Sequence, residues 1–193
     1  MSKERINSVM IALRFIIFAI LVIFILFWSM NCCIRKFVYP LEYKKEVLES
    51  SSRYNLDSAL VFAVIKVESN FDSDATSGAG AVGLMQITPS TAEYISKLVN
   101  KKDYDLFNAA DNIEFGCFYL NYLLAKFGNL QTALYAYNAG EGKVAGWLKD
   151  KKYSLDGTTL FNVPYKETKE YTEKISETFS KYKKLYGNIL DKR

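Results

Sequence analysis

An uncharged, strongly apolar segment near the start of the chain is the feature that most restricts its fold. Residues 15–34, FIIFAILVIFILFWSMNCCI, contain no Asp, Glu, Lys or Arg. As a helix, this segment would be about 30 Å long, which matches the hydrocarbon core of a bilayer. No small-residue cleavage site follows it, and Met30 and Asn31 before Cys32 do not fit a lipoprotein signal. We therefore predict an uncleaved transmembrane signal anchor, with a cleaved signal peptide as the alternative.

Positive charge lies on both sides of this segment, so charge alone does not orient it. The residues before it carry three basic side chains and one acidic side chain, and Arg35 and Lys36 follow it directly. The predicted organisation is an N-terminal segment over 1–14, the anchor over 15–34, a linker over 35–44, one globular domain over 45–187 and a C-terminal tail over 188–193.

The composition excludes several kinds of functional site. The chain has no histidine, so Ser-His or Cys-His nucleophilic pairs and histidine-ligated zinc sites cannot be formed. Cys32 and Cys33 end the apolar segment and Cys117 lies in an apolar stretch, so no disulfide framework within the domain is indicated. The formal net charge is only +4 and the lysines alternate with acidic residues, which gives no indication of a nucleic-acid partner.

After the anchor, apolar residues recur at helical spacing, and no stretch alternates as a strand would. A loop rich in Gly, Ala, Ser and Asp, residues 72–83, separates two of the helical segments. Thr88 is a natural N-cap with Pro89 at the first helical position, and Gly187 is expected to end the last helix. The sequence thus predicts an all-α domain of roughly 150 residues, enough for a sizeable core.

The stretch ALVFAVIKVESNF, residues 59–71, predicts a helix of the protein interior, yet it contains a glutamate near its end. Glu68 follows Leu60 and Val64 at intervals of four, so it lies on an apolar stripe. Loss of hydration and the negative end of the helix dipole would both raise its pKa. Such a carboxyl can hold a proton near neutral pH and then donate it. The alternative is that Glu68 points into solvent from the last turn.

Three other stretches carry polar residues at turns or on helices. GAGAVGLMQITP predicts a tight turn between Gly83 and Gln86, AYNAG ends a helix just before its glycine, and ETKEYTEKI carries a tyrosine on the last helix. Taken singly, each has an ordinary structural explanation, namely an interhelical loop, a helix terminus and a core tyrosine. The side chains of interest in the last two stretches are Tyr137, Asn138 and Tyr171.

Together, ES at 68–69, GLMQI at 83–87, AYNAG at 136–140 and ETKEY at 167–171 resemble the soluble lytic transglycosylase family of peptidoglycan-cleaving enzymes. The motifs occur in the family's order and with its typical spacing, over roughly residues 45–185. The resemblance implies a lysozyme-like, all-α fold with a cleft for the glycan strand.

The resemblance also implies a role for individual residues. Glu68 falls on the catalytic acid of the family. Ser77 and Gln86 fall on residues that line the sugar sites. Tyr137 and Asn138 would shape the cleft and orient the N-acetyl group of the substrate or the acid. Tyr171 would lie close to the acid.

Two positions depart from the family pattern. Thr172 stands where members often carry valine, which is expected to affect packing more than chemistry. Thr88 stands where some members have methionine, so a sugar contact at this position is left open.

Ordinary glycosidases use two carboxylates, one as the acid and one as nucleophile or base. Near Glu68 the sequence offers Asp72 and Asp74, but both fall in the following loop, where we expect them to structure the loop. With one acid, the acetamido oxygen of N-acetylmuramic acid can stabilise the cation at C1 and the sugar's own 6-hydroxyl can attack. No metal and no cofactor would be needed. The alternatives are a goose-type muramidase that uses water and an inactive peptidoglycan-binding scaffold.

Because murein lies outside the cytoplasmic membrane, the resemblance implies that residues 1–14 are cytoplasmic and that the catalytic domain over 45–187 is extracytoplasmic. The expected partners are peptidoglycan glycan strands and the cytoplasmic membrane, which the N-terminal helix would span once. The sequence indicates neither a protein partner nor the biological process.

Overall fold

The structure is a computed structural model that describes the backbone of residues 3–190 and, of the side chains, Met10 and those from Leu13 onward. It divides into two units, Met1–Leu41 and Glu42–Arg193, and each is described by itself. The predicted boundaries at 1–14 and 188–193 lie partly outside the described residues.

The first unit is one long helix, α1 (Lys3–Cys33), followed by a π-helical turn, η1 (Ile34–Val38). Its segment Leu13–Val38 is long and apolar enough to cross a membrane, and none of it is buried inside the protein. The helical state of the predicted anchor is therefore confirmed, and the predicted linker begins with the helical residues of η1.

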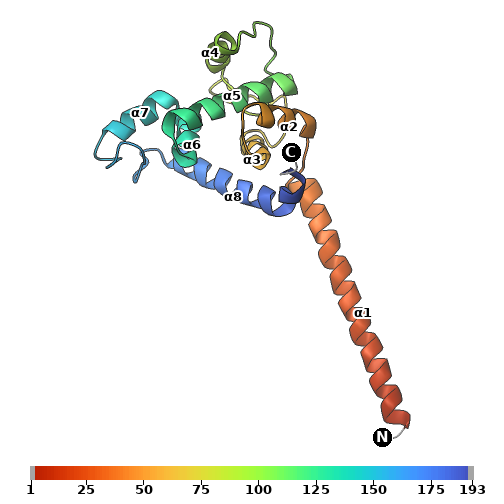
Figure 1. The fold of residues 1–193 in the computed structure, drawn as a ribbon. Helices are drawn as coiled ribbons and strands as arrows, with labels where there is room; N and C mark the ends of the chain where they lie inside the picture. Colours follow the sequence, from red (N-terminus) through yellow and green to blue (C-terminus); the bar gives the residue numbers. More distant parts are fainter. Residues whose placement is uncertain (1–2, 191–193) are drawn as a thin grey trace. The chain divides into compact units, whose positions relative to one another are not determined.

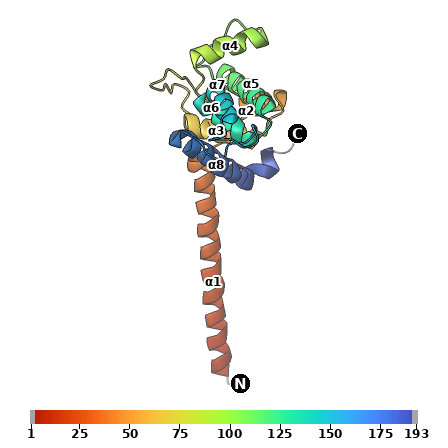
Figure 2. The same cartoon turned by 90° about the vertical axis from the view of Figure 1, so that its left-hand side faces the viewer.

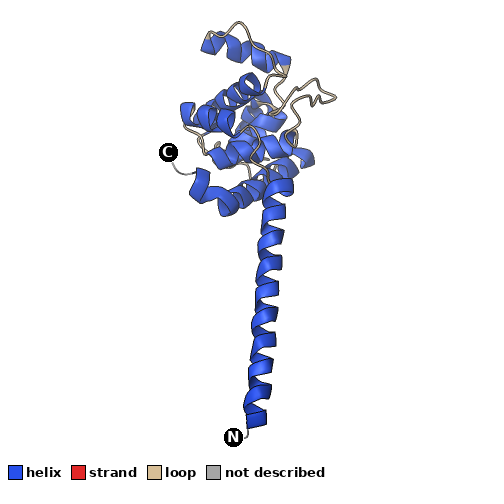
Figure 3. Cartoon of the chain, turned by 90° about the vertical axis from the view of Figure 1, so that its right-hand side faces the viewer, coloured by secondary structure: helices blue, strands red, loops and turns tan. Residues whose placement is uncertain are grey.

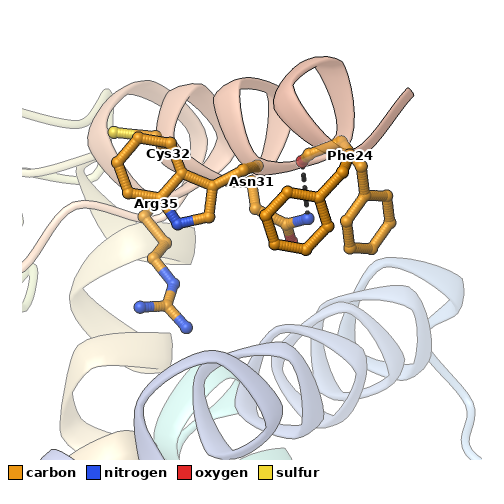
Figure 4. A pocket seen from close by; sticks show the side chains of 6 residues that line it. Phe24, Asn31, Cys32 and Arg35 are labelled. Carbon is orange, nitrogen blue, oxygen red and sulfur yellow. Dashed lines mark hydrogen bonds between the residues drawn. The ribbon is translucent and has the colours of Figure 1, made fainter. Parts of the chain in front are cut away.

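One face of α1 and η1 carries polar groups among aromatic rings (Figure 4). The Asn31 side-chain amide donates a hydrogen bond to the Phe27 carbonyl at 2.9 Å, one turn earlier. That bond satisfies a polar group in a strongly apolar segment of the helix. The residues that line a pocket on this face are Phe24, Phe27, Trp28, Asn31, Cys32 and Arg35.

The second unit consists of seven helices in the described part of the chain, so the all-α prediction is confirmed (Figure 3). Among residues 42–190 the only β-type pairings are two isolated bridges, Thr76 with Val82 and Val82 with Ile87. The helices are α2 (Lys44–Arg53), α3 (Ser58–Glu68), α4 (Pro89–Val99), α5 (Ala109–Phe127), α6 (Leu130–Ala139), α7 (Glu141–Lys149) and α8 (Lys166–Leu190).

Helix α3 is the central helix of this unit, because its residues 59–65 are all buried. Helix α8 packs along α3 and also contacts α6, while α5 packs against α2 and α6 (Figures 1 and 2). Helix α4 packs against α5. Cys117 on α5 is fully buried, as predicted for a small core residue. Burial of α3 brings its C-terminal end, with Glu68, among the other helices.

Side-chain caps fix where the helices begin. The Asp57 carboxylate accepts from the Ala59 N–H and starts α3, and the Thr88 hydroxyl accepts from the Thr91 N–H and starts α4, with Pro89 at its first position as predicted. The predicted end of the last helix at Gly187 is wrong, because α8 continues to Leu190. Leu190 is only 5% exposed, and burying it outweighs the roughly 1 kcal/mol helix penalty of a glycine.

Candidate active site

Glu68 is the last residue of α3, and its carboxyl lies in a mostly protein environment with partial access to solvent. Burial raises its pKa from 4.5 to about 7, although a hydrogen bond from Tyr171 and the positive charge of Lys174 oppose the rise. At neutral pH the carboxyl is therefore divided between its protonated and ionised forms. The environment predicted from the apolar stripe is the one found, and the solvated alternative is wrong.

Two tyrosines from separate helices face this carboxyl. The Tyr171 hydroxyl, on α8, donates a hydrogen bond of 2.5 Å to Glu68 Oε1. Tyr137, on α6, donates from its hydroxyl to the Met85 carbonyl at 2.9 Å. Burial and the charge of Glu68 raise the pKa of both phenols well above their usual value, so both stay neutral hydrogen-bond donors. The structure thus brings Glu68, Tyr137 and Tyr171 together, and the family resemblance had implied that Tyr171 lies close to the acid.

The segment GLMQ forms the predicted tight turn. Gly83 and Gln86 have φ of 74° and 49°, and the Gln86 N–H donates to the Gly83 carbonyl at 3.1 Å. The Gln86 side-chain amide donates to the carbonyls of Ala75 and Gly83 at 3.2 and 3.0 Å. Within residues 42–190 its Oε1 accepts no hydrogen bond, which leaves one acceptor for another molecule.

A fully buried asparagine that the sequence reasoning missed holds this turn in place. Asn112 Oδ1 accepts from the Met85 N–H at 2.7 Å, and Asn112 Nδ2 donates to the carbonyls of Val82 and Leu106 at 2.8 and 2.7 Å. A signal was available for its burial alone, because Asn112 lies three and four residues before Phe115 and Gly116, on the buried face of α5. A polar residue in such a position must find partners when it is buried.

Two glycines allow this close approach. A Cβ on Gly83 would lie 2.3 Å from Asn112 Nδ2, and a Cβ on Gly116 would lie 2.3 Å from the Met85 sulfur. A hydrogen bond also joins α3 to this turn, because the Ser69 hydroxyl donates to the Leu84 carbonyl at 2.9 Å. The end of α3 and the GLMQ turn are thereby joined next to the acid.

Ser77 lies in the loop after α3 and Asn138 lies next to Tyr137 near the end of α6, and in the described residues neither hydrogen-bonds to Glu68. The Ser77 hydroxyl accepts from the Ala81 N–H at 3.0 Å and closes its own loop. Asn138 Oδ1 accepts from the Thr168 hydroxyl at 2.7 Å, which joins the end of α6 to α8. Both side chains belong to exposed residues, so they remain accessible to a ligand.

The two other acidic residues near the end of α3 are exposed loop residues. The Asp72 carboxylate accepts from the Asp74 N–H at 2.9 Å, which confirms that Asp72 structures the loop. Neither carboxylate shares the buried setting of Glu68. In the described part of the chain, no group of three or more His, Cys, Asp or Glu residues is placed to hold a metal ion.

The fold and this acid-centred site place the chain among the lysozyme-like, all-helical domains. More specifically, the chain belongs to the transglycosylase SLT domain family, whose model matches residues 46–160. The resemblance drawn from the four motifs is thereby confirmed.

Curated relatives and solved structures agree with this assignment. The chain is 30% identical over 155 residues to the soluble lytic murein transglycosylase of Salmonella typhimurium, covering 77% of this chain and 24% of that protein. It is 36% identical over 130 residues to the membrane-bound lytic murein transglycosylase C of Mannheimia succiniciproducens, covering 60% of this chain and 36% of that protein. The soluble lytic transglycosylase SLT70 of Escherichia coli superposes with a TM-score of 0.68 at 28% identity, covering 77% of this chain and 25% of that structure. The chain thus spans about a quarter of the length of the soluble relatives.

Proposed function

We propose that this chain is a membrane-anchored peptidoglycan lytic transglycosylase with Glu68 as its single acid and base. The observation that carries the proposal is the buried Glu68 carboxyl, whose pKa of about 7 lets it hold a proton at neutral pH and release it. The names of the relatives point to the same substrate, because they are lytic murein transglycosylases.

In the proposed reaction, Glu68 donates its proton to the oxygen of the β-1,4 bond between N-acetylmuramic acid and N-acetylglucosamine. The C1–O bond breaks, and the acetamido oxygen of the muramic acid stabilises the positive charge at C1. The 6-hydroxyl of the same sugar then attacks C1, and the Glu68 carboxylate takes its proton. The muramic acid end closes into a 1,6-anhydro ring, and no water is consumed.

The surroundings of Glu68 suit both halves of this cycle. Burial favours the protonated form before bond cleavage, and the Tyr171 hydroxyl stabilises the carboxylate that cleavage leaves behind. Neither of the two carboxylates that follow α3 shares this setting, because Asp72 and Asp74 are exposed. We therefore favour attack by the sugar's own hydroxyl over attack by water, since an intramolecular group has a large proximity advantage.

Four further residues are proposed to bind the glycan in a cleft around the acid. Gln86 offers its Oε1 as an acceptor for a sugar hydroxyl or amide N–H. Tyr137 shapes the wall next to Glu68. Ser77 and Asn138 are exposed, and they lie before and after the GLMQ turn in sequence. Thr88 is not included in this proposal, because its hydroxyl already caps α4.

We also propose that Leu13–Val38 anchors the chain in the cytoplasmic membrane, with the N-terminus inside and the catalytic domain outside. The length and composition of this helix and the membrane-bound relative support the anchoring. Protease added to wall-stripped cells should digest the domain without lysis. Protection of the domain in intact wall-stripped cells would contradict this topology.

The deciding experiment is mass spectrometry of the muropeptides that the purified full-length chain, in detergent, releases from peptidoglycan. The proposal expects products lighter by one water than hydrolysis products and resistant to borohydride reduction. Reducible ends would indicate a goose-type muramidase instead. No release by the wild-type chain would indicate a binding protein without activity.

A further inference from the structure

A row of tyrosine rings leads away from the acid and crosses three helices. Tyr137 on α6 lies 5.5 Å, between ring centroids, from Tyr119 on α5. Tyr119 stacks on Tyr122 at 6.2 Å with 15° between the ring planes. Tyr122 meets Tyr94 on α4 edge to face at 6.0 Å. The four rings thus form one continuous strip whose inner end is the proposed catalytic site.

The strip becomes more exposed with distance from the acid. Tyr119 and Tyr122 are partly buried, whereas Tyr94 is 43% exposed. Rings that served only to fill a core would be covered at the outer end as well. The inner part of the strip is therefore anchored by packing, and its outer part is open to a ligand.

Polar groups border the outer rings. The Lys126 ammonium lies 5.5 Å from the Tyr122 ring centroid and donates to the Tyr122 hydroxyl at 3.4 Å. The same ammonium pairs with Glu141 at 2.7 Å, so the strip carries no unbalanced charge at this point. A neutral aromatic surface edged by hydrogen-bonding groups suits a neutral ligand with one apolar face and a rim of hydroxyls.

We infer that Tyr119, Tyr122 and Tyr94 form an extended carbohydrate-binding strip that holds the glycan strand beyond the bond that is cleaved. A pyranose ring has an apolar C–H face that packs on the negative face of an aromatic ring, while its rim bonds to groups such as Lys126 and Glu141. The occupant is a glycan strand because the strip is continuous with Tyr137 beside Glu68. This inference rests on the proposed function.

The test measures binding by the full-length Glu68→Gln chain in detergent, which cannot cleave its ligand in the proposed mechanism. The probes are peptide-free murein glycan strands, one preparation of long strands and one of tetrasaccharide. Added Tyr94→Ala or Tyr122→Ala should each weaken binding of long strands by about two- to tenfold and leave the tetrasaccharide unchanged. Tyr122→Phe should bind long strands within about twofold of the parent, because it keeps the ring.

Ile189→Ala is the control. Ile189 is 44% exposed, and it lies roughly 27 Å along α8 from Tyr171, which contacts Glu68, so its loss should not change binding. Should Tyr122→Ala not fold, Tyr94→Ala decides alone, because that side chain is exposed.

Unchanged affinity of the tyrosine variants for long strands would overturn the inference and leave the proposed function standing. An equal loss of affinity for the tetrasaccharide and for the long strands would also overturn it, since the outer rings would then not act beyond the cleaved bond. If the Glu68→Gln parent binds neither probe, the proposed function itself fails.

Discussion

Replacing Glu68 with glutamine should inactivate the chain and, unusually for a change at a buried site, make it more stable. Glutamine keeps the shape of the side chain, and its Oε1 can still accept the hydrogen bond from Tyr171. It cannot donate a proton, and general acid catalysis is typically worth about 10²–10⁴-fold. We therefore expect activity on peptidoglycan to fall by about that factor, with glycan binding retained.

The gain in stability follows from the raised pKa of Glu68. That pKa is about 7 in the folded chain against an ordinary 4.5. Because each pKa unit corresponds to about 1.4 kcal/mol, ionised Glu68 destabilises the fold by about 3 kcal/mol at most. Below the lower pKa both states are protonated and the effect vanishes. It develops as the pH rises from about 4.5 to about 7, because the folded state then binds more protons, and it stays constant above that range.

Denaturant unfolding of the full-length chain in detergent at about pH 5 and about pH 8.5 measures this difference. The free energy of unfolding of Glu68→Gln should exceed that of the wild type by about 3 kcal/mol or less at the higher pH and by much less at the lower pH. Asp72→Asn is the matched control, because that carboxylate is exposed in the adjoining loop.

Three results would contradict this reasoning. A Glu68→Gln variant that is less stable than the wild type at high pH would mean that ionised Glu68 is stabilised by its surroundings. Activity within a few-fold of the wild type would remove Glu68 from the mechanism. Loss of activity in Asp72→Asn as large as in Glu68→Gln would restore a two-carboxylate scheme.

Three further substitutions test the surroundings of the acid. Tyr171→Phe removes a hydrogen bond that lowers the pKa of Glu68, so the pKa of Glu68 should rise. The decrease in kcat/KM with rising pH should then occur at higher pH. A midpoint of the pH–rate profile that is unchanged or lower would contradict this. Thr172→Val should raise the free energy of unfolding by about 1 kcal/mol in a denaturant titration without changing activity, because the Thr172 hydroxyl is buried and lacks a partner in the described residues. Asn112→Ala should lower the free energy of unfolding by about 3 kcal/mol or more, since it leaves the Met85 N–H and the Leu106 carbonyl without this partner and leaves the Val82 carbonyl with only the Ile87 N–H. A change below about 1 kcal/mol would show that water or relaxation replaces these bonds.

Features that depend on local chemistry were predictable from the sequence. The Thr88 cap with Pro89 behind it is encoded in adjacent residues, and it starts α4 as expected. The turn between Gly83 and Gln86 was likewise visible, because a glycine with positive φ is a local requirement. The burial of Glu68 was predictable as well, because the apolar stripe that indicated it lies within α3 itself.

Features that depend on distant packing were predictable only in part. The hydrogen bond between Tyr171 and Glu68 joins residues 103 positions apart, and only the family resemblance brought them together beforehand. Asn112 escaped notice because its three partners all belong to backbone outside its own helix, which no local pattern indicates. Gly187 was misjudged for a related reason, since the packing of Leu190 decides the end of α8. The domain boundaries and the binding roles of Ser77 and Asn138 stay predictions.

The position of the acid depends on two adjacent backbone residues, Leu84 and Met85, to which three helix-borne or helix-capping side chains are tied. Ser69, at the end of α3, donates to the Leu84 carbonyl, and Tyr137 of α6 donates to the Met85 carbonyl. Asn112 of α5 accepts from the Met85 N–H. Leu84 and Met85 are fully buried, so none of these bonds is exchanged for water without loss of stability. A change in α5 or α6 that shifts this turn therefore also shifts the residues that pack around Glu68. Such a shift changes the desolvation that holds the pKa of Glu68 near 7. Substitutions at Asn112 should accordingly lower the pH midpoint of activity as well as the stability, although that side chain does not touch the acid.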